Sequence, residues 1–266
     1  MSTHRTIGVL GAGEVGQAVA DKAVRHGHDV LIGNSRGPGT LEALVGRLGP
    51  GARGVTAEEA AKPELVFLSV PFFAVPELTG LTTWAGKIVV DTTNQFAAAN
   101  PWRGRYDVGD LTGSEWVARH LPGARIVKAL NTLYAPFIAA DPRHAEGRQV
   151  AFYAGDDADT KAAVAGLLDA FGFAALDLGG LREGGRLMQL DGALSAKHLL
   201  CRTSTDAPTH PSAQEEHHEP SCRPHPWRAA GGRPDRHRGT GADARARSGP
   251  HPHHRLPGAP RRSPGR

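Results

Sequence analysis

Three glycines near the N-terminus have the spacing of a phosphate-binding turn. Gly11, Gly13 and Gly16 form G-x-G-x-x-G directly after a short apolar run at residues 6–10. In a strand–turn–helix unit, the first glycine allows a tight turn, the second lets the backbone approach a pyrophosphate, and the third lets the helix pack close to the strand. The helix then presents unpaired N–H groups and a partial positive charge to the phosphates. The motif therefore predicts a dinucleotide site.

The residues after the next strand indicate which dinucleotide is bound. An NAD-binding fold has a carboxylate there to hold the adenosine ribose, but this chain has Asn34, Ser35 and Arg36. A carboxylate would repel a 2′-phosphate, whereas Ser35 can hydrogen-bond one and Arg36 can pair with it or stack on the adenine. The sequence therefore predicts NADP(H). The alternative is that Arg36 is only a solvated turn residue.

Short apolar runs predict the elements that position these residues. A βαβ unit has strands at 6–10 and 29–32 around a helix that ends at Gly27. We expect further strands at 53–55, 65–70, 87–91 and 125–130, a helical crossover at 74–81, and a helix that starts from a capping box at 112–115. This pattern predicts an α/β fold, a Rossmann-type doubly wound and mostly parallel sheet, with strand order 3-2-1-4-5-6.

Ligands of such a sheet gather at the carboxyl ends of its strands. Ser69, Val70 and Pro71 follow the predicted fourth strand, Asn94 follows the fifth and Asn131 the sixth. Pro71 fixes the backbone where a nicotinamide ring would lie flat, and Asn94 or Asn131 can bond its carboxamide or ribose. The alternative is that these residues only cap loops.

The chain divides into three predicted parts. Residues 1–136 form the NADP-binding Rossmann domain. Residues 137–200 form a small αβ unit that completes the active-site cleft, with strands at 150–154 and 174–178, a helix at 158–171 and a final helical segment within 181–200. Residues 201–266 form a tail rich in Arg, Pro and His.

We expect the tail to be disordered, because Leu256 is its only aliphatic residue larger than alanine. Such a composition also results when GC-rich codons are read out of frame, so a frameshifted C-terminus and a genuine basic tail are both open interpretations.

The basic excess lies in the tail and does not make the folded part a nucleic-acid binder. Both cysteines, Cys201 and Cys222, also lie there, which fits a reducing cytoplasm. No segment has the spacing of a metal site or the length of a membrane span, so we expect neither.

Groups that could act as catalysts are few. The chain has no Ser-His-Asp order, no nucleophile elbow and no cysteine before Cys201. Lys128, His120 and His198 could each transfer protons, but a structural role is favoured for all three. We therefore assign no catalytic residue and expect a reaction that needs no acid or base from the protein.

Six segments together resemble the NADPH-dependent coenzyme F-420 reductases, the F-420:NADP oxidoreductases of archaea and actinobacteria. They are IGVLGAGEVG, GNSRG, SVP, VKALNT, AGDD and GGLREGGRL, and the resemblance covers about residues 5–195. It implies that a deazaflavin lies against the nicotinamide and exchanges a hydride with it directly. The residues that it implies for the pyrophosphate are Ala12, Gly13, Glu14 and Val15; for the 2′-phosphate, Ser35 and Arg36; and for the nicotinamide side, Val70, Pro71 and Ala129.

The resemblance also implies a homodimer contact. Members of this family continue into an apolar C-terminal helix that helps cover the deazaflavin, and here the tail takes its place. Other interpretations stay open. They are a reductase of another small acceptor, a non-catalytic NADP(H)-binding sensor, an inactive truncated product, and a dehydrogenase or imine reductase, for which residues 137–200 are too short to supply a helical substrate domain.

Overall fold

Six parallel strands form the sheet that the sequence predicts. The structure, a computed structural model, describes residues 4–98 and 103–202. Every neighbouring pair among these six strands is parallel, and the strand order is β3-β2-β1-β4-β5-β6. This confirms the doubly wound fold. The strands are β1 (Thr6–Leu10), β2 (Asp29–Gly33), β3 (Ala52–Val55), β4 (Leu65–Leu68), β5 (Ile88–Asp91) and β6 (Arg125–Ala129).

The residues of the predicted small unit extend this same sheet. Strand β8 (Gly147–Gly155) pairs antiparallel with β6, and β9 (Ala174–Asp177) pairs parallel with β8. Two short strands, β7 (Arg143–His144) and β10 (Leu200–Cys201), also pair with β8. Continuous backbone hydrogen bonding therefore joins the C-terminal strands to the nucleotide-binding half.

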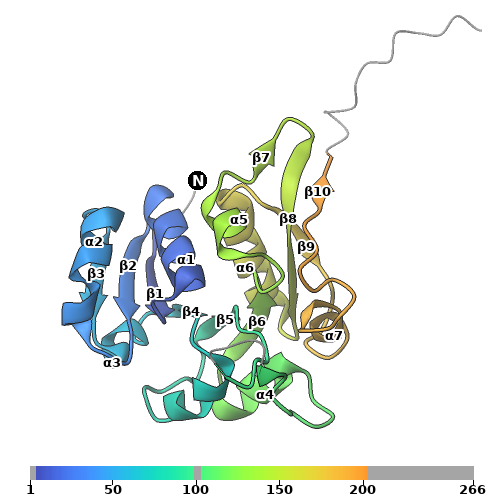
Figure 1. The fold of residues 1–266 in the computed structure, drawn as a ribbon, viewed down its shortest axis with the longest axis horizontal. Helices are drawn as coiled ribbons and strands as arrows, with labels where there is room; N and C mark the ends of the chain where they lie inside the picture. Colours follow the sequence, from blue (N-terminus) through green and yellow to red (C-terminus); the bar gives the residue numbers. More distant parts are fainter. Residues whose placement is uncertain (1–3, 99–102, 203–266) are drawn as a thin grey trace, which may run out of the picture. The chain divides into compact units, whose positions relative to one another are not determined.

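Helices cover both faces of the sheet (Figure 1). One apolar cluster joins the strands to α1 (Glu14–Arg25), α2 (Glu42–Leu48), α5 (Ala135–Ala139) and α6 (Ala158–Ala170). Alternate residues of the same strands face a second cluster, which includes α3 (Ala57–Ala60), the 3-10 helix η2 (Phe72–Leu78) and α4 (Gly113–His120). Strands β4 and β5 are therefore buried at every residue.

Local sequence features explain where α4 begins and why η2 is not an α-helix. In α4 the Thr112 side chain accepts the Glu115 N–H at 3.2 Å, and the Glu115 carboxylate accepts the Thr112 N–H at 2.7 Å, which confirms the capping box. The predicted helical crossover at 74–81 is instead the 3-10 stretch η2, which contains Pro76. Proline has no N–H to donate, so a regular α-helix is disfavoured there.

The final helical segment predicted within residues 181–200 is confirmed only in part. Helix α7 covers only Glu183–Met188, and the backbone then turns through left-handed conformations at Asp191 and Ala196. The chain returns to the sheet at β10, where the Val150 N–H donates to the Leu199 carbonyl at 2.8 Å. Regular structure thus passes the predicted boundary at residue 200, and the predicted disordered tail beyond residue 202 lies outside the described residues. No helix among the residues described is long and apolar enough to cross a membrane.

Two truncations test where the fold ends. A chain that stops after Arg202 keeps β10 and loses only one large aliphatic residue, so its melting temperature and NADPH affinity should stay nearly unchanged. A chain that stops after His198 also loses β10 and the Leu199 carbonyl, which accepts from Val150 and from the Gln149 side chain. At about 1 kcal/mol per hydrogen bond, we expect its melting temperature to fall by roughly 4–8 °C. A large fall for the first truncation would show that the tail packs on the domain.

Candidate functional site

The glycine turn brings two strand ends and a helix into backbone contact. Gly11 has φ +100°, its N–H donates to the Gly33 carbonyl at 2.8 Å, and a Cβ there would lie 2.2 Å from the Ser69 carbonyl oxygen. A Cβ on Gly16 would lie 2.0 Å from the Gly11 carbonyl oxygen. Any side chain at either position would push the start of α1 away from the strands. The sequence pattern therefore fixes where the helix begins.

Gly13 is different, because nothing lies within 4 Å of the place where its Cβ would be. It is the N-cap residue of α1, and its carbonyl accepts the first helical N–H, from Gln17, at 2.9 Å. The N–H groups of the first turn have no acceptor within the helix and point out of its N-terminus. The exposed Glu14 also lies in this turn. An anion here would meet the backbone N–H groups with no intervening side chain at Gly13.

A pocket of about 720 Å³ opens at this turn. Its walls come from residues 10–15 of the turn, residues 33–36 after β2, and residues 69–78 in the segment after β4. Eleven of the residues predicted to bind the nucleotide line it. They are Gly11, Ala12, Gly13, Glu14, Val15, Asn34, Ser35, Arg36, Ser69, Val70 and Pro71.

The end of the pocket at β2 has a polar turn. The Asn34 carbonyl oxygen Oδ1 accepts the Arg36 N–H at 2.9 Å, and its Nδ2 donates to the Thr40 hydroxyl at 3.0 Å. Asn34 thus shapes the loop, while the side chains of Ser35 and Arg36 stay exposed at the pocket. Sequence analysis did not single out Thr40, although a threonine in a short loop after Asn-Ser-Arg is a common turn residue.

A second pocket, of about 280 Å³, continues from the first. The two share Val15, Ser69, Val70 and Pro71, and the second extends to Thr92, Thr93, Asn94, Phe96 and Ala98. The Ser69 and Thr92 hydroxyls lie 3.0 Å apart and join the ends of β4 and β5. Among the described residues that line this second pocket, none has a titratable side chain.

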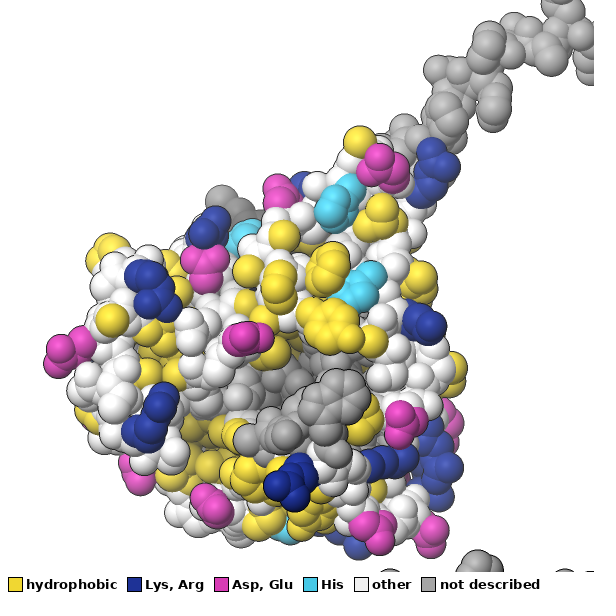
Figure 2. Space-filling model, in the orientation of Figure 1, with side chains coloured by type: hydrophobic (Ala, Val, Ile, Leu, Met, Phe, Trp, Pro, Cys, Tyr) yellow, Lys and Arg dark blue, Asp and Glu magenta, His cyan; other side chains and the backbone are white. Residues whose placement is uncertain are grey.

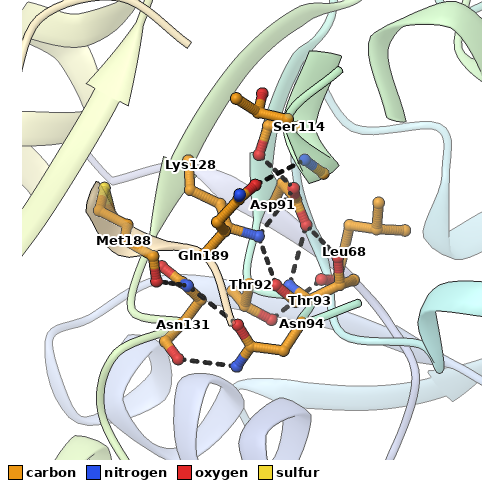
Figure 3. Close-up of polar contacts among 12 residues, drawn as sticks. Leu68, Asp91, Thr92, Thr93, Asn94, Ser114, Lys128, Asn131, Met188 and Gln189 are labelled. Carbon is orange, nitrogen blue, oxygen red and sulfur yellow. Dashed lines mark hydrogen bonds and ion pairs between the residues drawn. The ribbon is translucent and has the colours of Figure 1, made fainter. Parts of the chain in front are cut away.

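Two asparagines link this second pocket to the C-terminal segment (Figure 3). The Asn131 side chain donates to Asn94 Oδ1 at 3.1 Å and to the Met188 carbonyl at 2.8 Å, and Asn94 donates back to the Asn131 carbonyl at 2.9 Å. Leu130, just before Asn131, has φ +62° and is buried. This left-handed conformation costs about 1–2 kcal/mol and turns the chain toward Asn94 at the end of β6.

A buried ion pair lies directly behind the second pocket. Asp91 and Lys128 are paired in register on β5 and β6, and Lys128 Nζ lies 3.1 Å from Asp91 Oδ2. Burial lowers the pKa of Lys128, while the neighbouring Asp91 carboxylate acts in the opposite direction. Ser114 on α4 donates to the same carboxylate at 2.7 Å. Sequence analysis missed Asp91 and Ser114, although opposite charges at the ends of adjacent buried strands were a usable signal.

Of the three groups that the sequence suggested for proton transfer, Lys128 and His120 have polar partners, whereas neither ring nitrogen of His198 has a hydrogen-bond partner among the described residues. Lys128 is enclosed in the ion pair. His120 contacts the Trp116 carbonyl at 2.9 Å, and His198 lies against Tyr134 and Phe137, where burial lowers its pKa. None of the three lines either pocket.

Three predicted site residues do not line the two pockets. Gly16 is enclosed in the glycine turn, and Asn131 lies behind Asn94. Ala129 is completely buried in the core, so its contact with a nicotinamide stays a prediction. Figure 2 shows a hollow near the middle of this view, with apolar side chains beside it and charged side chains both close to its rim and around the outline.

Comparisons with known proteins agree with this geometry. The model of the family described as NADP oxidoreductase, coenzyme F420-dependent, matches residues 6–95, which include the glycine turn, all of the first pocket and all of the second pocket except Phe96 and Ala98. The rat (Rattus norvegicus) protein metalloreductase STEAP3 is 31% identical over 178 residues, which are 66% of this chain and 34% of that protein. This chain thus spans about a third of the length of that curated relative.

Two crystal structures resemble most of the described fold. A hypothetical protein from Sinorhizobium meliloti is 35% identical with a TM-score of 0.70, over 76% of this chain and 97% of the other. A proposed F420-dependent NADP reductase from Arthrobacter sp. FB24 is 30% identical with a TM-score of 0.58, over 67% and 86% of the two chains. The protein therefore belongs to the family of coenzyme F420-dependent NADP oxidoreductases.

Proposed function

We propose that this protein transfers a hydride between NADP(H) and the deazaflavin coenzyme F-420. The observation that carries the proposal is the uncharged lining of the second pocket, which continues directly from the nucleotide pocket. Hydride transfer between two stacked redox cofactors needs alignment and the exclusion of water, and no acid or base from the protein. A pocket lined by Val70, Pro71, Thr92 and Asn94 suits that reaction.

In this proposal NADP(H) binds along the two pockets. Its 2′-phosphate would lie at Ser35 and Arg36, its pyrophosphate over Gly13 at the start of α1, and its nicotinamide in the second pocket, whose lining residues support this assignment. Arg36 supplies positive charge to the 2′-phosphate, and the helix N-terminus supplies partial positive charge to the pyrophosphate. The carboxamide of the nicotinamide pairs with Asn94, whose amide Asn131 orients.

A partly exposed aromatic surface follows Asn131 in the chain, and the proposal assigns this surface to the deazaflavin. It includes Tyr134 and Phe137, whose side chains are 62% and 44% exposed. His198 stacks on Tyr134 with ring centroids 5.5 Å apart. Flat aromatic surfaces of this kind suit a planar ring system. The proposed direct transfer places that ring on the open side of the nicotinamide, opposite Val70 and Pro71.

The match to metalloreductase STEAP3 favours a second candidate. In that candidate the same NADP(H) site reduces another small acceptor. Both candidates use the same nucleotide pocket, and they differ only in what lies on the open side of the nicotinamide.

Turnover with coenzyme F-420 tests the proposal. NADPH and oxidised F-420 mixed with the protein should bleach the visible absorbance of the deazaflavin, and NADP with reduced F-420 should restore it. Heat-inactivated protein is the control for the uncatalysed reaction. If the protein binds NADPH tightly and leaves that absorbance unchanged in both directions, F-420 is not the acceptor. Oxidation of NADPH by other acceptors would then support the second candidate.

Replacing Arg36 tests the choice of nucleotide. Arg36→Ala removes a charge-assisted bond to the 2′-phosphate, worth about 1.5–3 kcal/mol, so NADPH affinity should fall roughly 10- to 150-fold while NADH affinity changes little. Titration of both nucleotides measures the ratio. Arg119→Ala, on the exposed side of α4, removes the same charge far from the pocket and should leave the ratio unchanged. An unchanged ratio in Arg36→Ala would refute the role given to Arg36.

Adding a methyl group at Gly13 tests the pyrophosphate position. The new Cβ of Gly13→Ala meets no protein atom within 4 Å, so the fold should tolerate it, but it fills space that the phosphates need. We expect NADPH affinity to fall at least roughly tenfold, with a change in melting temperature of only a few degrees. Gly166→Ala in α6, where a Cβ is equally unobstructed, is the matched control. Equal NADPH affinity in the two variants would contradict the assigned position.

A further inference from the structure

The Asp91–Lys128 pair is buried more completely than fold stability alone explains. The Asp91 side chain has no exposed surface and that of Lys128 is 3% exposed. Removing two charges from water carries a large desolvation cost, and apolar replacements of similar size often maintain or increase stability. Backbone hydrogen bonds already join β5 to β6. We therefore look for a role of the ion pair other than holding these two strands together.

Apart from the bond that Asp91 accepts from Ser114, the other side-chain hydrogen bonds of the pair converge on one pocket residue, Thr93. Asp91 Oδ1 accepts the Thr93 N–H at 2.9 Å and the Thr93 hydroxyl at 2.7 Å. Lys128 Nζ donates to the carbonyl oxygen of Thr93. The N–H, the side chain and the carbonyl of Thr93 are thus all held by the two charged groups, as Figure 3 shows.

Thr93 lies between the two polar residues that shape the second pocket. Thr92 bridges to the Ser69 hydroxyl at the end of β4, and Asn94 pairs with Asn131 after β6. Rotation of the Thr93 backbone would move both neighbours, because they share its peptide units. The ion pair therefore fixes the backbone between Thr92 and Asn94, which line the second pocket, although neither Asp91 nor Lys128 lines it.

We propose that Asp91 and Lys128 are positioning residues that immobilise the nicotinamide ring by fixing Thr93. Asp91 orients the N–H and hydroxyl of Thr93, and Lys128 orients its carbonyl, so that Thr92 and Asn94 present constant surfaces to the ring. The inference rests on the proposed function in placing the nicotinamide in the second pocket. It does not depend on the identity of the hydride acceptor.

The test uses a double variant, because either single variant leaves one buried charge unpaired and can fail to fold. Asp91→Val with Lys128→Met removes both charges and all three hydrogen bonds to Thr93 at similar side-chain volume, so the melting temperature should recover most of what either single variant loses. NADPH affinity should stay within about threefold of wild type, because the phosphate contacts are unchanged. Single-turnover hydride transfer should slow by roughly 10- to 100-fold, since small misplacements of reacting groups have effects of this size.

A second measurement needs no acceptor. The fluorescence of bound NADPH reports how tightly its reduced nicotinamide is held, and the double variant should lose most of the enhancement that wild type gives at saturation. Lys22→Met is the matched control, because Lys22 is also a buried lysine that donates to a carbonyl, that of Ala140, but lies far from Thr93. It should lose stability and keep both the fluorescence enhancement and the transfer rate.

The outcomes separate this inference from the proposed function. If wild type does not reduce F-420, the proposed acceptor fails, and the fluorescence comparison still decides the role of the ion pair. A double variant that is stable, binds NADPH and matches wild type in fluorescence overturns the inference. A double variant that is stable and matches wild type in transfer rate also overturns it.

Discussion

Helices cover both faces of the parallel sheet, so its polar side chains can contact a ligand only at the edge where the strands end. Strands β4 and β5 are buried at every residue, so side chains along their length serve the core. The first polar side chains that reach the surface are those just past the strands, such as Ser69 and Asn94. The direction of the strands brings the ends of β1, β2, β4, β5 and β6 to the same edge. The position of the site follows from this arrangement.

Short-range sequence signals predicted where the glycine turn and the loop after β2 lie at this edge. Gly11 and Gly16 are required by close backbone approaches, and Ser35 and Arg36 follow a strand whose end the hydrophobic pattern already marks. Each signal depends on neighbours within a few residues. The capping box at Thr112 is of the same kind and also formed as predicted. Local patterns of this type survive folding because tertiary contacts reinforce them.

The other half depends on contacts between distant residues, and there the sequence was a poorer guide. Residues 189–201 have helical composition, but they form no helix. The backbone turns at Asp191 and Ala196, and β10 pairs with β8. Asp91 and Lys128 are far apart in the sequence, and only the register of β5 with β6 shows that they are partners. Asn131 was predicted as a ligand contact, and the fold uses it to orient Asn94 and to hold the Met188 carbonyl. Local periodicity contains no information about such pairings.

This difference has a physical consequence for how the two cofactors are recognised. In the proposed function, backbone N–H groups, Gly13 and the exposed Arg36 bind NADP(H), so nucleotide specificity would rest on a few local features. The proposed acceptor side would depend on Asn131 donating to Met188 and on Gln95 donating to Gln189 at 2.9 Å, because these contacts connect the C-terminal segment to the strand ends. Under that proposal, changes in residues 189–202 would alter the acceptor side while the glycine turn stays intact. Nucleotide recognition and the choice of acceptor would then depend on separate parts of the chain, so related chains could share the first and differ in the second.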